Sequence, residues 1–231
     1  MPSFDLSMLL SGPYHAMLLD GLKLSLILLG VSAVLALPLG ILIALARLSP
    51  LAPLRALGTV FLESQRNVPL LAHMLFWYFA APELLSNPAQ QWLNDHNLEA
   101  SAAVVAITLY YGAFISEDVR SGIRAVPSVQ LEAARALGLS WFASMRLVIL
   151  PQALRVITPP LLSQTLNIWK DTSIATVIGA AELMYQAAKV ESTTFRSVEA
   201  FSFATASYLA VSLLITALAS WYHHRFPPRT A

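Results

Sequence analysis

The stretch Val126–Pro151, VPSVQLEAARALGLSWFASMRLVILP, decides how the rest of the chain is arranged. It lies between long apolar segments, but Glu132, Arg135 and Arg146 interrupt it. A charged side chain at the centre of a bilayer costs about 2.5–3.5 kcal/mol on insertion scales, so this stretch is not expected to cross a membrane. We therefore predict that it folds outside the lipid, between two membrane-spanning segments.

The same stretch has the pattern of two short amphipathic helices. Leu131, Ala134, Leu137 and Trp141 recur at helical spacing. Gly138 stands between the two pieces, where glycine permits a tight turn. A patterned helical hairpin between spans is suited to docking with another protein, and we interpret residues 126–146 as such an element.

The composition places most of the chain in a bilayer. Of 231 residues, 57% are hydrophobic and 12% are charged, and the mean hydropathy is +0.64. Soluble domains carry about 25% charged residues. The net charge of +1 gives no reason to expect nucleic-acid binding. Cysteine is absent, which excludes disulfides, thiolate nucleophiles and cysteine metal sites.

Hydropathy predicts an all-α polytopic membrane protein. A helix needs about 20 apolar residues to cross the hydrocarbon, and we predict five spans at 22–46, 57–80, 98–125, 147–169 and 201–222. Outside the spans, we expect a lead-in at 1–21, the hairpin at 126–146, a partial or re-entrant helix at 172–192 and a tail at 223–231. No basic region precedes the first apolar run, so no cleaved signal peptide is expected.

Basic residues set the expected orientation, because short loops rich in Lys and Arg stay in the cytoplasm. If five spans alternate, one side has Lys189 and Arg196 in its loops, besides Lys170 at the end of the fourth span. The other side holds eight arginines: Arg47, Arg55, Arg120, Arg124, Arg135, Arg146, Arg225 and Arg229. We therefore predict an N-terminus outside the cell and a cytoplasmic hairpin and C-terminus.

Several ionisable residues fall within the predicted spans. Glu63 and Arg66 are three apart on one helical face and either pair with each other, anchor at lipid headgroups or line a pathway. His73 either lines a cavity or packs through a hydrogen bond. A second group near the end of the third span comprises Glu117, Asp118, Arg120 and Arg124. Such residues are functional candidates within a membrane, although a solvated helix end is an alternative for the second group.

Another candidate site follows the fourth span, where Lys170 precedes Asp171, Thr172 and Ser173. In a substrate site, Lys170 would receive a carboxylate and Asp171 would meet an ammonium. The hydroxyls of Thr172 or Ser173 and a freed helix N-terminus would assist. The alternative is that Lys170 extends toward the membrane surface while Asp171 caps a helix.

Several motifs together resemble one family. Glu132-Ala133-Ala134, Gly138 and Ile149-Leu150-Pro151 are similar to the EAA loop of permease subunits of binding-protein-dependent ABC importers. Arg66-Asn67-Val68-Pro69-Leu70-Leu71 is similar to the arginine-x-x-proline-leucine-leucine signature of the polar amino acid branch. Residues 117–123 and 170–174 resemble two further segments of that branch, so the resemblance covers nearly the whole chain.

This resemblance implies a type I ABC importer transmembrane domain at 22–222 in a bacterial inner membrane. It implies ATP-binding subunits, a second permease subunit, an extracytoplasmic solute-binding protein and an amino acid substrate as partners. Residues expected to couple to the ATPase are Gln130, Glu132, Ala133, Ala134, Gly138 and Pro151. Members often carry Gly-Gln before the glutamate, whereas Val129-Gln130 stands here, so the loop can begin with a different turn.

The resemblance is closest to glutamate/aspartate importer permeases, because of the Arg66–Leu71 motif and the Trp77-Tyr78 and Pro82–Leu85 context. An acidic amino acid is therefore the expected substrate, and a basic or neutral polar amino acid is the alternative. The substrate-pathway candidates are Glu63, Arg66, His73, Lys170, Asp171, Thr172 and Ser173.

The sequence carries no motif for chemistry of its own. It lacks the Gly-x-x-x-x-Gly-Lys-Ser/Thr phosphate loop, so ATP is expected to bind a different chain. It also lacks Gly-x-Ser-x-Gly and His-Glu-x-x-His, which argues against the rival class of membrane hydrolases. An accessory membrane subunit that carries no substrate is a further alternative. His223 and His224 are sequence neighbours that do not share a helical face, so neither a metal nor a cofactor is expected.

Overall fold

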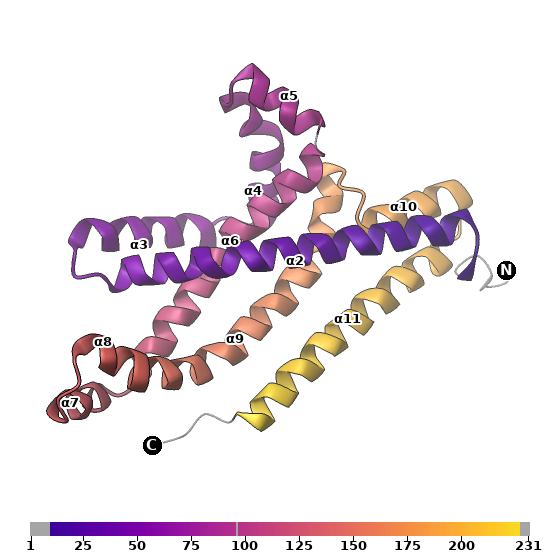
Figure 1. Ribbon diagram of the computed structural model, residues 1–231. Coiled ribbons are helices and arrows are strands. Elements are labelled where there is room, and N and C mark those ends of the chain that lie inside the picture. The colour runs from indigo at the N-terminus through magenta and orange to yellow at the C-terminus, as the bar shows by residue number, and fades with distance from the viewer. Residues whose placement is uncertain (1–9, 96, 227–231) are drawn as a thin grey trace.

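The computed structural model describes residues 10–95 and 97–226, and within these ranges every regular element is a helix (Figure 1). The first half contains α2 (Pro13–Leu48), α3 (Ala52–Arg66), α4 (Leu70–Leu75), η1 (Phe76–Ala80), η2 (Pro82–Leu84), α5 (Asn87–Asp95) and α6 (Leu98–Arg124). The second half contains α7 (Ser128–Ala136), α8 (Trp141–Ser144), η3 (Met145–Ile149), α9 (Leu150–Asp171), η4 (Thr172–Ile178), α10 (Leu183–Thr194) and α11 (Ser197–Arg225).

Four helical runs among the described residues are long and apolar enough to cross a membrane. They are Pro13–Leu48, Leu98–Arg124, Trp141–Ile178 and Ser197–Arg225, and they correspond to the predicted spans at 22–46, 98–125, 147–169 and 201–222. Residues 13–21 of the predicted lead-in are instead part of α2, which begins at Pro13 because proline suits the first helical turn. Residues 1–9 of that lead-in and 227–231 of the predicted tail, Arg229 included, lie outside the described residues.

The predicted span at 57–80 is wrong as a single helix. Helix α3 ends at Arg66, and α4 begins at Leu70 after Pro69 adopts an extended backbone. Proline has no N–H to continue the helical ladder, and it also drives the residue before it, Val68, away from helical geometry. The two pieces and η1 nevertheless carry the chain from the end of α2 to the projection around α5, from which α6 returns (Figure 1).

Small side chains allow α2 to lie close to its neighbours. The buried face of α2 repeats every three or four residues: Leu18, Gly21, Ser25, Leu28, Ser32, Ala36, Gly40 and Ala44. At Gly40, a Cβ atom would collide with Ile115 and lie 3.0 Å from the carbonyl oxygen of Gly112. In a bilayer, where helices gain no hydrophobic advantage from association, such close approach supplies the van der Waals contact that joins them. The α2–α6 pair is therefore the centre of the bundle.

Helix α9 packs between α6 and α11. Its side chain Trp169 is completely buried and donates its indole N–H to the carbonyl of Tyr208 at 3.0 Å. Toward α6, Gln164 donates to Asp118 at 2.8 Å. The predicted partial helix at 172–192 becomes the short 3-10 helix η4 followed by α10, which packs against α2 and α11.

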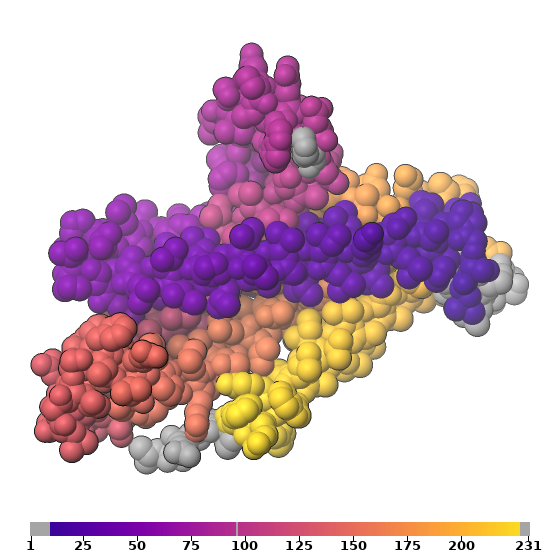
Figure 2. All heavy atoms as spheres, in the orientation of Figure 1, coloured from indigo at the N-terminus to yellow at the C-terminus, as the bar shows by residue number. Residues whose placement is uncertain are grey.

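The hairpin predicted around Gly138 is confirmed. Gly138 has a φ of 86°, and the N–H groups of Gly138 and Leu139 donate to the carbonyls of Arg135 and Ala134. This pair of bonds is the Schellman arrangement that ends a helix at a left-handed residue. Ser140 then caps α8 by accepting from the N–H of Ala143. Figure 2 shows the hairpin as a lobe at one end of the molecule, separate from the projection around α5.

Candidate functional site

The predicted coupling residues cluster on the α7–α8 hairpin, defined here as residues 128–144. Gln130 is half-buried, and Glu132 and Ala133 are exposed on α7. Ala134 is buried and supplies one carbonyl to the Gly138 turn. Pro151 lies beyond the hairpin, in the first turn of α9. Five of the six predicted residues therefore belong to one small surface element, and the sixth begins the helix that follows it.

Large apolar side chains are exposed on this hairpin. Leu137 is 84% exposed, and Phe142 is 69% exposed. Val129 and Trp141 are exposed beside them. Large apolar side chains gathered on one exposed surface mark contact sites for other proteins. The hairpin presents both a charged group, Glu132, and an apolar surface to a partner.

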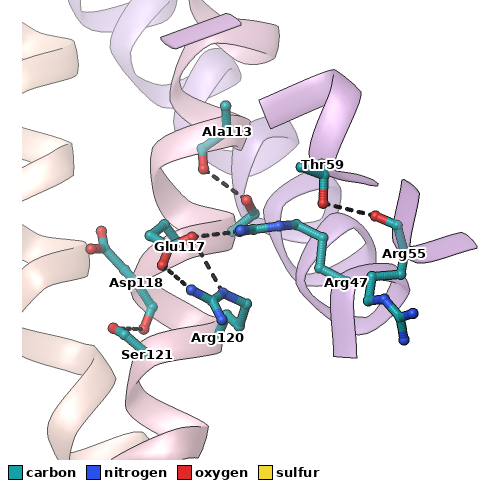
Figure 3. Close-up of polar contacts among 9 residues, drawn as sticks. Arg47, Arg55, Thr59, Ala113, Glu117, Asp118, Arg120 and Ser121 are labelled. Atoms are coloured by element: carbon teal, nitrogen blue, oxygen red, sulfur yellow. Dashed lines mark hydrogen bonds and ion pairs between the residues drawn. The ribbon is translucent and has the colours of Figure 1, made fainter. Parts of the chain in front are cut away.

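An ion-pair cluster fixes the end of α2 against α6 (Figure 3). Glu117 accepts from Arg47 and, at 2.6 Å, from Arg120. Because the Arg47 side chain is only 11% exposed, its positive charge is compensated by this carboxylate rather than by water. Of the two alternatives for Glu117 and Arg120, a functional group or a solvated helix end, the structure shows both in a contact between helices. Its third member, Arg47, comes from the end of α2.

The second polar contact joins α6 to α9. Asp118 accepts from the side chain of Gln164 at 2.8 Å. The guanidinium of Arg66 lies 5.1 Å from the centre of the Phe114 ring, in a cation–π contact. Of the alternatives for Glu63 and Arg66, the mutual pair does not form, and Glu63 instead accepts from Asn67 at 2.8 Å. Arg66 thus faces α6, while Glu63 bonds to Asn67 at the C-terminal end of its own helix.

His73 is held by packing contacts. Its Nε2 lies 3.3 Å from the carbonyl oxygen of Gln65, and its ring meets Tyr110 edge to face at 5.9 Å. These contacts join α4 to α3 and α6 across the break at Pro69. Of the two interpretations that the sequence allowed, the structure gives a hydrogen-bonded packing residue.

The predicted Lys170–Ser173 group is only partly brought together. Asp171, predicted to meet a substrate ammonium, accepts a hydrogen bond from the hydroxyl of Tyr111 at 2.6 Å. Thr172 is buried and donates to the carbonyl of Trp169, while Ser173 donates to the carbonyl of Lys170. The expected helix N-terminus is wrong, because α9 passes directly into η4 at this point. Lys170 itself is exposed.

One buried acid was not singled out from the sequence. Glu182 is 0% exposed and accepts from the hydroxyls of Ser25 at 3.0 Å and Tyr208 at 2.8 Å. It also accepts from the hydroxyl of Thr176 and from the N–H of Tyr185. One carboxylate thereby ties α2, η4, α10 and α11 together. The available signal was a single acid within the apolar segment 172–190.

Nothing in the described ranges resembles a catalytic or metal centre. No group of three or more His, Asp or Glu side chains among residues 10–95 and 97–226 is arranged to hold a metal ion. The polar side chains named above are engaged in helix-to-helix contacts or exposed. The arrangement can dock a partner at one end and present polar groups within the bundle.

Comparison with known proteins gives consistent matches. Residues 36–231 match the family described as the binding-protein-dependent transport system inner membrane component. A probable glutamine ABC transporter permease of Bacillus subtilis is 37% identical over 209 residues, covering 90% of this chain and 88% of the relative. A glutamate/aspartate import permease of Escherichia coli is 33% identical over 227 residues, covering 97% and 99%. The crystal structure of an amino acid ABC transporter with histidines superposes with a TM-score of 0.85, 30% identity and coverage of 97% and 100%.

Proposed function

The chain belongs to the family of binding-protein-dependent transport system inner membrane components, and we propose that it forms the pathway for an acidic amino acid. It is a multi-pass membrane subunit of an amino acid ABC importer. Its relatives are transport subunits rather than enzymes, which agrees with the absence of a phosphate loop. Permeases of this family work with ATP-binding and substrate-binding partners.

The observation that carries the proposed mechanism is the α7–α8 hairpin. ATPase subunits bind its exposed surface, with Glu132 and the apolar side chains as contacts, and their closure and opening move the bundle. The helical run Trp141–Ile178 starts in this hairpin and enters the core without a break. A displacement at the surface therefore reaches the pathway through one helix. A second permease subunit, either another copy or a related chain, completes the pathway.

The proposed orientation puts the hairpin and C-terminus in the cytoplasm and the N-terminus outside. In Figure 1 the hairpin and the C-terminal end of α11 lie toward the same end of the molecule, and α2 starts at the other. The arginine-rich segments predicted to be cytoplasmic are the α2–α3 connection, the hairpin and the end of α11. This distribution follows the preference of basic loops for the cytoplasmic side.

The acidic substrate is supported by the Arg66–Leu71 motif and by the glutamate/aspartate relative, which matches over nearly its full length. The glutamine relative favours a neutral substrate instead. A reconstitution of this chain with its ATP-binding and solute-binding partners separates the two. We expect ATP-dependent uptake of labelled glutamate and aspartate to exceed that of glutamine and arginine. Uptake of glutamine but not glutamate would overturn the acidic assignment, and uptake without this chain would overturn its role in the pathway.

A further inference from the structure

The turn between η4 and α10 is bonded at both of its ends to one residue, Thr176. The turn begins at Gly179, whose φ is 84° and whose N–H donates to the carbonyl of Thr176 at 3.0 Å. It ends at Glu182, which caps α10 by accepting from the N–H of Tyr185 at 2.9 Å. The Glu182 carboxylate also accepts from the hydroxyl of Thr176, within η4. A left-handed glycine is a natural swivel point, and this second bond closes it.

The hydroxyl of Thr176 is used differently from those of its neighbours. Thr172 and Ser173 each donate to the backbone carbonyl three residues earlier. Local bonds of this kind are the usual use of serine and threonine within helices. Thr176 instead donates to a side chain six residues further along the chain. The Thr176–Glu182 bond therefore joins two helices across the turn at Gly179.

The helices on the two sides of this turn belong to different parts of the bundle. Helix α10 lies at the end of the molecule opposite the hairpin, where α2 begins (Figure 1). Its buried residues pack with α2 and α11 in one cluster: Leu18, Leu183, Ala187, Val190, Ala200 and Ala204. On the other side, η4 continues α9 without a break, and its Ala175 and Ile178 belong to the core cluster that includes Tyr111 of α6. The turn thus separates a brace on α2 and α11 from the core around α6 and α9.

The other two bonds of the Glu182 carboxylate do not cross the turn. They come from the hydroxyls of Ser25 on α2, at 3.0 Å, and Tyr208 on α11, at 2.8 Å. Ser25 also accepts from the N–H of Leu183 at 3.1 Å. These bonds anchor α10 to its neighbours, whereas the bond from Thr176 fixes α10 to η4.

We propose that Glu182 is a positioning residue of the transport cycle, whose bond to Thr176 locks α10 to η4. With the lock in place, α10 and the α9–η4 run move as one body when the bundle changes conformation. A displacement of α10 then reaches the core instead of being taken up by rotation at Gly179. This inference rests on the proposed transport function and adds a moving part to it. Glu182 acts through η4 and not on the transported amino acid.

Distance measurements between two spin labels test the lock directly. Because the chain contains no cysteine, labels at Val177→Cys in η4 and Lys189→Cys in α10, both exposed, report on this pair in a complex with cysteine-free partner subunits. We expect one narrow distance distribution that is the same without nucleotide and with ATP. Thr176→Val should widen the distribution, and Thr176→Ser, which keeps the hydroxyl, should not. A distance that changes between the two states in the parent, or an unaltered distribution in Thr176→Val, would overturn the lock.

Transport by the reconstituted complex separates the lock from a purely structural role. Loss of one hydrogen bond to a charged group shifts an equilibrium about 10-fold or more. Thr176→Val should therefore lower amino acid import per ATP hydrolysed by about 10-fold and leave KM unchanged, and Thr176→Ser should restore import.

Ser25→Ala is the matched control for this measurement. It removes the bond to Glu182 and the bond from Leu183, so it should lower the melting temperature at least as much as Thr176→Val. It leaves the Thr176–Glu182 bond in place and should reduce import per ATP less. The reverse order of import, or an effect of Thr176→Val on KM alone, would show that Glu182 only stabilises the fold. Absence of uptake by the parent complex would instead count against the proposed transport function.

Discussion

Replacement of Gly138 by alanine should loosen the α7–α8 hairpin by an amount that the structure defines. Gly138 has a φ of 86°, and no atom lies within 4 Å of the position that a Cβ would occupy. The penalty therefore comes only from the left-handed backbone, which costs an L-residue about 1–2 kcal/mol. A change of this size alters the population of open hairpin about 5- to 30-fold.

Hydrogen exchange of the membrane-embedded protein measures this change directly. The informative amides are those of Gly138 and Leu139, which donate to Arg135 and Ala134 at 2.9 and 3.2 Å. Exchange in a peptide spanning the hairpin should accelerate about 5- to 30-fold in Gly138→Ala. Gly138→Asn is the matched control, since asparagine tolerates the left-handed region and should exchange nearly as the parent does.

The functional consequence follows in the reconstituted transporter. A loosened hairpin should lower the amount of amino acid imported per ATP hydrolysed in Gly138→Ala more than in Gly138→Asn, while membrane insertion stays intact. If alanine and asparagine gave equal exchange rates, backbone strain at Gly138 would not govern the hairpin. Normal import per ATP in Gly138→Ala, despite faster exchange, would remove the hairpin from force transfer.

Three further changes test the packing of the bundle. In a thermal unfolding assay, Gly21→Ala should destabilise the bundle by about 1–3 kcal/mol. The new Cβ would lie 2.9 Å from Leu183 Cα and 3.0 Å from the Glu182 carbonyl oxygen. The control Gly30→Ala, which has open space around it, should be neutral or stabilising in this assay. Glu182→Gln puts an amide N–H₂ donor where the buried carboxylate accepts hydrogen bonds, and should lower the free energy of unfolding by about 1–3 kcal/mol. The control Glu83→Gln, at an exposed position, should leave it unchanged. Equal melting temperatures for the two variants would refute the role of Glu182 in joining α2, η4, α10 and α11. Glu117→Ala should lower the unfolding temperature more than Arg120→Ala, because only the former also leaves Arg47 unpaired; the reverse order would contradict the cluster.

Four of the five predicted spans and the hairpin match the structure. Hydropathy and charge suffice for these elements because each depends only on its own segment and on whether lipid or water surrounds it. The turn at Gly138 was predictable for the same reason, since a left-handed helix end is a local property. The break between Arg66 and Leu70 was also encoded locally, by Pro69. It was missed because proline is tolerated in membrane helices when neighbouring groups satisfy the freed backbone, and hydropathy alone does not show whether they do.

The Tyr111–Asp171 contact and the role of Glu182 could not be predicted in this way. Each depends on the register between segments far apart in sequence, such as Tyr111 with Asp171 or Ser25 with Glu182. A single sequence shows that an acid or a lysine lies in an apolar region, but it does not show which helix lies opposite. The same limit left open whether Glu63 and Arg66 pair with each other. Spacing allows that pair, whereas α6 offers Arg66 the Phe114 ring and Asn67 occupies Glu63.

The positions of the hairpin and of Lys170 on one helical run give the proposed mechanism a mechanical basis. Trp141 lies at the hairpin end of the run and Ile178 at the other, so the proposed docking surface and the candidate residues Lys170 and Asp171 share one backbone. Gln164 and Asp171 fasten this run to α6, and Trp169 fastens it to α11. The run contains the π-helical turn η3 and ends in the 3-10 helix η4, but no loop interrupts it between the hairpin and Lys170. In the proposed mechanism, the run moves together with these bonded neighbours.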